Sequence, residues 1–338
     1  MTKTLLVDGN NLFQIGFHGV REYYHEGKHI GAIYHFVNTI RRFIEEHNFN
    51  KVIVFWDGAD NASQRRLFYP EYKSNRKETL NPQKKESYEW QNLRIRKYLE
   101  EMFIRQVEID GAESDDAIAY YCQIAKDEKI TIFSSDKDLT QLISENVQIY
   151  SPSKKKYYKY GDKIDLYHIS IPHQNIAVFK TISGDKSDNI DGIQYLGEKT
   201  FVKLFPELVD DVIKIEDILE KAEKLLSEDK GNRALMNLLS GKTRKGVFGD
   251  EFFEVNKRLV DLSNPLLDDE SKQTIKSYYE EDIDPENRGY KNLMRLMRED
   301  GIFKYLGKYD NAWVNFLTPF MKLTRSEKRR FKTKKRKL

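Results

Sequence analysis

Acidic side chains stand at the ends of three apolar segments of this 338-residue chain. The segments lead into Asp8, into Asp57 and, through two serines, into Asp136. A single strand-terminal aspartate is ordinarily a turn residue or a helix N-cap. Three of them favour a shared site, because chemistry in parallel sheets gathers beyond the carboxyl ends of the strands.

Further acids recur in short clusters, and neither histidine nor cysteine accompanies them. Capping a helix requires one or two acids, whereas packed carboxylates repel one another unless cations neutralise them. Oxygen ligands alone favour Mg²⁺ or Mn²⁺ over zinc, and two such ions about 4 Å apart can drive phosphodiester hydrolysis. The candidate ligands are Asp8, Asp57, Glu113, Asp115, Asp116, Asp136, Asp138, Asp185 and Asp188.

The segments before these acids are continuous apolar runs rich in β-branched residues, which is typical of strands buried on both faces. Helical spacing of apolar residues separates them, as at Phe36, Ile40 and Phe43. Strands that alternate with helices predict an α/β domain with a largely parallel sheet.

Other segments have a different character. Residues 60–106 are polar and rich in basic and aromatic side chains, and residues 151–163 indicate a hairpin or loop. Residues 172–205 indicate a helix, a glycine-containing loop and a helix. Residues 206–265 are predicted to be mainly helical with a flexible stretch at 231–249, and further helices follow in 266–323.

Charge is unevenly distributed. Residues 325–338 carry a net charge of +8, which leaves a net −5 for the rest of the chain. A basic tail on a mildly acidic body favours attraction to nucleic acid by counterion release, and the alternative is a disordered, solubilising tail or a targeting signal. We expect no transmembrane helix and no signal peptide, and the single Cys122 fits a reducing cytoplasm.

Six short motifs follow one another along roughly residues 1–265. They are VDGNN at 7–11, FWDG at 55–58, YKSNR at 72–76, GAESDDAIA at 111–119, SSDKDLTQLI at 134–143 and GDKSDNIDGIQYLGEKT at 184–200. No single motif is decisive, but the ordered set is specific: it resembles the flap endonuclease and 5′-nuclease family, and within it the T-even-type phage ribonuclease H.

The resemblance implies a PIN-like fold, 5′→3′ exonuclease and flap endonuclease activity, and removal of RNA primers and adjacent DNA in replication. It also implies a division of the chain: an α/β nuclease domain at 1–170 that includes an arch at 60–106, a helix–three-turn–helix region at 171–265, a helical region at 266–323 and a basic tail at 324–338.

The same resemblance assigns roles to individual residues. A first metal site comprises Asp8, Asp57, Glu113, Asp115 and Asp116, and a second comprises Asp136, Asp138, Asp185 and Asp188. Lys73 and Arg76 face the scissile phosphate, where they can stabilise developing charge. Nucleic-acid contacts fall to Tyr72, Arg65, Arg66, Gly192, Gly197 and Lys199. Two Mg²⁺ ions are implied, with Mn²⁺ able to substitute.

One loop departs from the family pattern. Tyr195 stands where the family usually has a glycine, and Asp191 where it has a proline. These changes put in doubt the usual loop shape and the K⁺ ion that the family often binds there.

The implied partners are DNA with 5′ flaps or nicks, RNA–DNA hybrid, and through the family a single-strand-binding protein and a sliding clamp. We expect a monomer without membrane association, located in the cytoplasm, which is that of a phage-infected bacterium if the chain is of phage origin. Alternatives are a non-catalytic DNA-binding protein on this fold and a PIN-type RNA-directed nuclease. A haloacid dehalogenase phosphatase is disfavoured, because Asn10 stands where that class needs a second acid.

Overall fold

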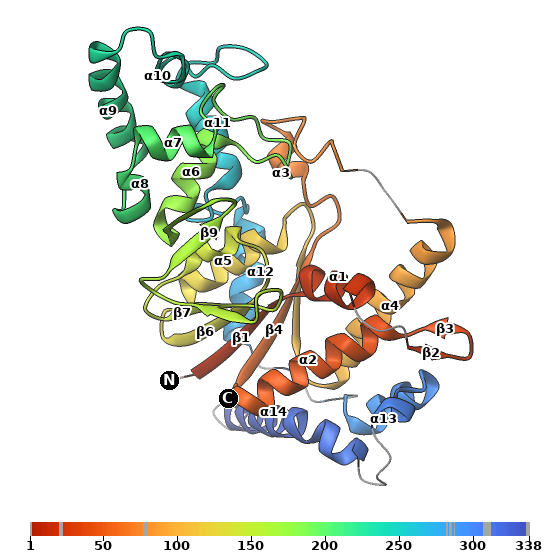
Figure 1. The fold of residues 1–338 in the computed structure, drawn as a ribbon. Coiled ribbons are helices and arrows are strands. Elements are labelled where there is room, and N and C mark those ends of the chain that lie inside the picture. The colour runs from red at the N-terminus through yellow and green to blue at the C-terminus, as the bar shows by residue number, and fades with distance from the viewer. Residues whose placement is uncertain are drawn as a thin grey trace.

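A six-stranded sheet forms the centre of the protein in a computed structural model that describes residues 2–19, 23–76, 80–281, 283, 286, 288–306 and 312–335 (Figure 1). All neighbouring strands run parallel except the last pair. In spatial order the strands are β5 (Arg105–Ile109), β4 (Lys51–Asp57), β1 (Thr2–Asp8), β6 (Glu128–Phe133), β7 (Val147–Ser151) and β8 (Lys156–Tyr158).

The three apolar segments predicted as strands are the three central strands of this sheet. Every residue of β1 from Thr4 to Asp8 is buried, as expected for a strand covered on both faces. Parallel register pairs Val7 with Val54 on one side and with Phe133 on the other. The carboxyl ends of β1, β4 and β6 therefore meet at one edge, and the predicted α/β fold with a largely parallel sheet is confirmed.

Helices cover both faces of the sheet (Figure 1). Alternate residues of β1 separate the two cores: Leu5 and Val7 pack into one, and Leu6 into the other. The first core takes in α1 (Gly9–Gly19), α2 (Gly31–His47), α4 (Pro82–Glu101) and the carboxyl-terminal α13 (Tyr290–Glu299) and α14 (Ala312–Lys335). The second takes in α5 (Ser114–Ile124), α6 (Ile176–Ser183), α11 (Glu251–Val260) and α12 (Asp269–Glu280).

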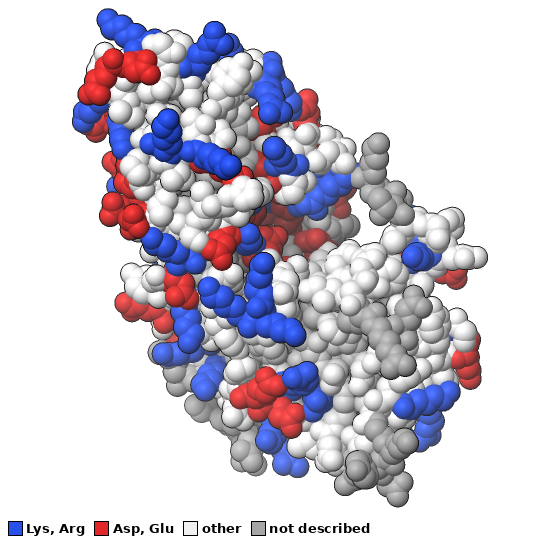
Figure 2. Space-filling view, viewed as in Figure 1, with Lys and Arg blue, Asp and Glu red and all other residues white. Residues whose placement is uncertain are grey.

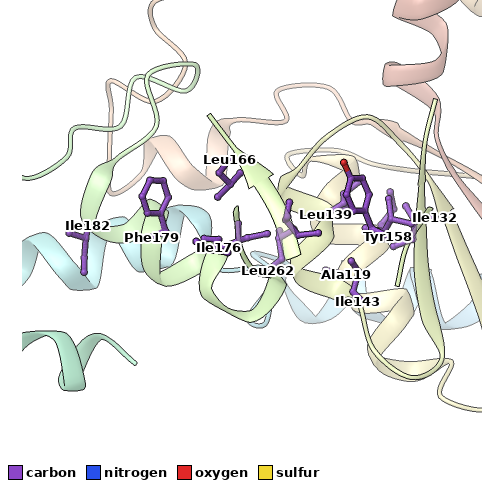
Figure 3. Close-up of a cluster of buried hydrophobic side chains, with 14 of the residues drawn as sticks. Ala119, Ile132, Leu139, Ile143, Tyr158, Leu166, Ile176, Phe179, Ile182 and Leu262 are labelled. Carbon is purple, nitrogen blue, oxygen red and sulfur yellow. The ribbon is translucent and has the colours of Figure 1, made fainter. Parts of the chain in front are cut away.

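The second core extends without a break from the sheet into the helices beyond it. Figure 3 shows Ile132 of β6 and Ala119 of α5 in the same buried cluster as Phe179 and Ile182 of α6. Leu139, on the 3₁₀ helix η1 (Asp138–Leu142), lies between them and is fully buried. This packing fixes α6, and so the loop that follows it, relative to the carboxyl edge of the sheet.

The remaining elements are short, apart from α9. The predicted helix–loop–helix at 172–205 consists of α6 and α7 (Glu198–Leu204), and the predicted hairpin at 151–163 is the turn between β7 and β8. The others are β2 (Tyr24–His25), β3 (Lys28–His29), α3 (Ser63–Arg66), β9 (Lys163–Leu166), β10 (Ile169–Pro172), η2 (His173–Asn175), α8 (Glu207–Asp210), α9 (Ile215–Glu228), α10 (Arg233–Leu239) and η3 (Ile302–Tyr305).

The stretch at 231–249, predicted to be flexible, has defined structure instead. Asn232 caps α10 by accepting a hydrogen bond from the Leu235 backbone N–H at 3.3 Å. A bridge between Lys242 and Val247 then closes a hairpin before α11. Gly241 and Gly249, at φ +59° and +57°, are turn residues of this hairpin.

The carboxyl-terminal helices share the core of the sheet. Leu293, Met297 and Phe320 pack into the same cluster as Leu5 and Val7 of β1. Helix α14 also runs without interruption across the boundary at 323/324 where the sequence suggested that a tail begins. Within the described residues, no helix has the length and apolar character needed to cross a membrane.

Candidate active site

Two aspartates at the carboxyl edge of the sheet are held in fixed orientations by neighbouring side chains. Asp8 accepts hydrogen bonds from the Asn11 backbone N–H at 2.9 Å and from the Ser134 hydroxyl at 2.8 Å. Asp57 accepts from the Asn10 amide at 2.8 Å and from the Ser114 backbone N–H at 2.9 Å. The strand ends thus position both carboxylates at the base of one site.

Helix α5 begins at the same edge and contributes three more acids. Glu113 is its N-cap residue, and Asp115 lies in the first turn. Asp116 is oriented differently, because the Arg65 guanidinium donates to both of its oxygens at 2.6 and 3.2 Å. Asp116 also accepts from the Leu266 backbone N–H at 3.0 Å and is 1% exposed. Its hydrogen-bonding capacity is therefore largely used within the protein.

A second acidic group surrounds a buried lysine on α6. Lys180 is 7% exposed and forms ion pairs with Asp138 and, at 2.6 Å, with Asp185. Asp185 also accepts from the Ser187 backbone N–H at 2.8 Å. Asp136 accepts from the Asp138 backbone N–H at 2.8 Å, which orients it toward the same space.

Basic side chains enter the site from the segment after α3. Lys73 pairs with Glu113, and Arg76 pairs with Asp188 at 2.6 Å. The Lys73 backbone N–H donates to the Asp188 carbonyl at 2.9 Å, and the Asn189 amide donates to the Glu71 carbonyl at 2.8 Å. The segment that carries the cations is thereby fastened to the loop that carries Asp185 and Asp188.

Burial and mutual repulsion shift the protonation of these acids. Burial, reinforced by the charges of Asp57 and Asp136, raises the pKa of Asp8 to about 7 despite its hydrogen bonds. Burial and the neighbouring carboxylates also raise the pKa of Asp115 well above its ordinary value. The pKa of Asp138 rises to about 7 because burial outweighs the attraction of Lys180. The protein's own cations therefore do not neutralise the cluster fully.

The acids line a hollow between the two lobes of the molecule. Figure 2 shows red acidic side chains inside this hollow and blue basic side chains around it. A cavity of ≈ 100 Å³ is lined by Glu113, Asp115, Asp136, Asp138, Asp185 and Asp188 together with Lys73, Arg76 and Lys180. A larger cavity of ≈ 1010 Å³ between α5, α6 and β7 contains none of these carboxylates.

The donor set fits hard divalent cations. Carboxylates whose pKa is raised by burial and by one another are ionised only at a cost in free energy, which bound cations would reduce. Among the described residues, no three acidic, histidine or cysteine side chains stand in an arrangement that could hold a metal ion. This is consistent with Lys73 and Lys180, which occupy part of the space as counterions.

Two residues predicted to contact nucleic acid or to stack on bases, Arg65 and Tyr72, are buried in this structure. Arg65 is 4% exposed, because its guanidinium is committed to Asp116 and Glu113 in the interior. Tyr72 is 2% exposed and donates to Glu113 at 2.9 Å, so its ring is covered here. Arg66 is exposed, and its Nε donates to the Tyr72 carbonyl at 3.1 Å.

The loop before α7 keeps a glycine-like shape without the expected glycine. Tyr195 has φ +68°, a left-handed conformation that glycine adopts more easily. Gly192 is required for packing, since a Cβ there would lie 1.9 Å from the Ser183 carbonyl oxygen. Gly197 lies in open space as the N-cap of α7, and Lys199 in the first turn is exposed.

Sequence reasoning missed three residues that shape the site. Asn10 and Ser134 orient Asp57 and Asp8, and Lys180 joins Asp138 to Asp185. Asn10 and Ser134 lie inside the quoted motifs, so their proximity to the acids could have indicated a supporting role. Lys180 follows an apolar helical run and gave no such signal.

Comparison with known proteins identifies 5′-3′ exonucleases as relatives of this chain. Residues 3–167 match the family described as 5′-3′ exonuclease, N-terminal resolvase-like domain. A 5′-3′ exonuclease of Halalkalibacterium halodurans is 35% identical over 78% of this chain and 84% of its own length. DNA polymerase I of Bacillus subtilis is 31% identical over 67% of this chain but only 26% of its own length.

Solved structures share the fold. The phage T5 5′-exonuclease with bound divalent metal ions (zinc) aligns with a TM-score of 0.61 and 19% identity, over 89% of this chain and 98% of its own. A phage T5 flap endonuclease in complex with DNA and metal ions also gives a TM-score of 0.61, with 21% identity, over 82% of this chain and all of its own.

Proposed function

The chain belongs to the 5′-3′ exonuclease family, and from this premise we propose that it hydrolyses phosphodiester bonds near the 5′ ends of nucleic acids. The observation that carries the proposal is the excess of carboxylates, four of them buried, over cations at the carboxyl edge of the sheet. Such an excess disfavours a structural role, because buried charges in structural clusters are paired.

Two groups of residues would hold divalent cations, Mg²⁺ or Mn²⁺. Asp8, Asp57, Glu113 and Asp115 form the first, and Asp136, Asp138, Asp185 and Asp188 form the second. Asp116 belongs to the first group by motif, although its oxygens are held by Arg65 here. When bound, the cations supply an acidified water and neutralise charge at the scissile phosphate.

The chain's own residues supply orientation and positive charge. Asn10 and Ser134 fix the rotamers of Asp57 and Asp8, which keeps their free lone pairs directed into the hollow. Lys73 and Arg76 are each held by one carboxylate in this structure. If Glu113 and Asp188 were paired with other cations, Lys73 and Arg76 could turn toward a phosphate and stabilise its developing negative charge.

The proposal also concerns the substrate. We infer that 5′ flaps, nicked duplexes and RNA–DNA hybrids are cleaved, with removal of RNA primers as the biological role. A single strand would pass the segment at 60–106, where the amino-terminal half of α4 carries the exposed Lys84 and Lys85 and the half-buried Trp90. A K⁺ ion in the 184–197 loop, a single-strand-binding protein and a sliding clamp remain part of this proposal by family analogy.

A substrate panel tests the proposal. Labelled 5′ flap, nicked duplex, RNA–DNA hybrid and single-stranded RNA are incubated with Mg²⁺, with Mn²⁺ and with EDTA. We expect metal-dependent release of short products from 5′ ends, inhibition by EDTA, and no cleavage by Asp8→Ala despite retained DNA binding. Cleavage of the flap by Asp8→Ala with Mg²⁺ would overturn the assignment, and a preference for single-stranded RNA would favour a PIN-type RNA nuclease.

A further inference from the structure

Helix α4 is packed into the core along its carboxyl-terminal half only. Figure 1 shows its amino-terminal end extending away from the sheet. Residues 82–86 are all exposed, whereas Gln91, Ile95 and Leu99 further along the helix are 0% exposed. The position of the exposed end therefore depends on how firmly the buried half is held.

Helix α13 holds this buried half at two points. The Gly289 backbone N–H, at the amino end of α13, donates to the Glu101 carboxylate at 2.7 Å. Glu299, at the other end of α13, pairs with Arg94 at 2.7 Å. The two helices thus run antiparallel, and Met297 between these contacts packs into the same core cluster as α4.

Asp300 joins the carboxyl end of α13 to two residues of α4. Its carboxylate accepts from the Arg94 Nε at 2.7 Å and from the Tyr98 hydroxyl at 2.8 Å, and the residue is 5% exposed. Arg94 and Tyr98 are four residues apart and share one face of the helix. A buried, charge-assisted pair with a second hydrogen bond permits little rotation of α4 about its axis.

Further toward its exposed end, α4 meets the helix that supports the carboxylates. The Tyr88 ring lies edge-on to Phe13, with ring centroids 4.6 Å apart, and the Tyr88 hydroxyl accepts from the Gln14 amide at 2.8 Å. Phe13 and Gln14 belong to α1, whose Asn10 orients Asp57. The direction of α4 is therefore defined relative to the candidate active site.

We propose that Asp300 is a positioning residue for cleavage: through Arg94 and Tyr98 it sets the direction of α4, and so the place where the exposed end of α4 meets a single strand. These three residues are here called the α4 anchor. Misplacement of a bound strand by about 1 Å is enough to slow a reaction strongly. The inference deepens the proposed function and rests on it for the identity of the strand.

The α4 anchor depends on a segment outside the matched exonuclease domain. The family model covers residues 3–167, which include Arg94 and Tyr98 but not Asp300. The carboxyl-terminal region thereby acquires a role in cleavage, although its residues do not reach the carboxylates.

Hydrogen exchange in EDTA tests the α4 anchor without relying on cleavage. Asp300→Asn keeps the size of the side chain but leaves Arg94 with only Glu299, a partner whose side chain is 45% exposed. Amides of residues 86–93 should exchange at least about fivefold faster than in the wild type, because local opening of α4 becomes easier. Amides of β1 and β4 should be unchanged.

Single-turnover cleavage with Mg²⁺ at saturating enzyme then compares a duplex that has a long 5′ flap with a nicked duplex that has none. Only the flap presents a single strand to α4. Asp300→Asn should therefore lower the rate constant on the flap about tenfold and that on the nick less than about twofold. Saturation places the loss in the rate constant and not in binding.

Two variants control for a general loss of stability. Tyr98→Phe removes one hydrogen bond of the α4 anchor and no charge, so it should show the same changes at smaller size even if Asp300→Asn fails to fold. Glu128→Gln breaks a different buried ion pair, with Lys51 at 2.7 Å. It should lower the unfolding midpoint but leave the flap-to-nick ratio and the exchange difference between 86–93 and the strands unchanged.

Three outcomes would overturn the proposal: unchanged exchange at 86–93 in both anchor variants, equal losses on flap and nick, or the same change of ratio in Glu128→Gln. The proposed function fails in a different way. If the wild type cleaved neither substrate, the nuclease proposal would be refuted, whereas faster exchange in Asp300→Asn would still show that Asp300 fixes α4.

Discussion

Buried charged side chains lie at both the amino and the carboxyl edge of the sheet formed by β4, β1 and β6, and the two edges differ in charge balance. At the amino ends, the Lys51 ammonium donates to Glu128 at 2.7 Å and to the Tyr121 hydroxyl at 3.0 Å, and Thr4 donates to Glu128 at 2.6 Å. Lys51 and Glu128 form an ion pair within the described residues, and Glu128 also accepts from the Tyr121 hydroxyl at 2.9 Å.

At the carboxyl ends, acids outnumber the cations that reach them. Asp8, on the same strand as Thr4, has hydrogen bonds but no cationic partner among the described residues. Its pKa is raised to about 7, mainly by burial. A balanced cluster is stable by itself, whereas an unbalanced one costs stability that a ligand must offset. Charge balance, and not burial or charge alone, therefore separates the structural end from the candidate active site.

The largest effect is expected at Asp8, which has no cationic partner among the described residues. Asp8→Asn keeps the size of the side chain and removes its charge, so cation binding should fail and cleavage should fall at least about a thousandfold. The cleavage rate on a 5′-flap substrate measures this. Because an uncompensated carboxylate is lost, the unfolding midpoint in EDTA should equal or exceed that of the wild type. Cleavage within tenfold of wild type would remove the distinction between the two ends.

At the amino edge of the sheet, removal of a charge should lower stability and leave cleavage unchanged. Glu128→Gln leaves the Lys51 ammonium buried without its counterion, and the free energy of unfolding should fall by about 3 to 5 kcal/mol. Cleavage per folded molecule should not change, because this end lies at the opposite edge of the sheet. Chemical denaturation and a flap assay measure the two quantities.

A double variant provides the control for this experiment. Lys51→Met/Glu128→Leu replaces both charges by apolar groups and should recover most of the lost stability. A Glu128→Gln protein with normal stability and no cleavage would contradict the structural role of the Lys51–Glu128 pair.

Without bound metal, the free energy of unfolding should depend on pH because of Asp8 at the carboxyl edge of the sheet. The folded state holds the Asp8 proton more tightly than the unfolded state, with a pKa raised from 3.8 to about 7. Its contribution is therefore fully present below about pH 4 and is lost as pH rises to about 7, by less than about 4 kcal/mol. Denaturation in EDTA measures this loss, which Asp8→Asn should reduce and added Mg²⁺ should offset. A loss of the same size in Asp8→Asn would exclude this carboxylate as its source.

The smallest effect is expected at Asp116, which lies at the carboxyl edge of the sheet but is paired with Arg65. Asp116→Asn weakens the Arg65 pair and should lower stability by about 2 kcal/mol, since Arg65 keeps Glu113 as a partner. Cleavage per folded molecule should stay within about tenfold of wild type, whereas Asp115→Asn should lose it as Asp8→Asn does. Equal losses in both variants would instead assign Asp116 to the metal ligands.

Much of the fold could be predicted because its signals are local. Continuous apolar runs ending at Asp8 and Asp57 predicted buried strands, and the helical spacing after Gly31 predicted α2. The hairpin at 241–249 was not predicted, since its glycines and basic residues are equally typical of a flexible loop. Its order depends on contacts with Gln194 and Glu71, which are distant in the sequence.

The sequence by itself determined the acids, their positions at strand ends and the family to which their order belongs. Only the tertiary structure decided which charges meet. It buried Arg65 against Asp116, covered Tyr72 and placed Lys180 between Asp138 and Asp185. The reason is physical: residue type and periodicity act over one or two turns, whereas pairing of buried charges depends on which side chains the packed core brings within reach.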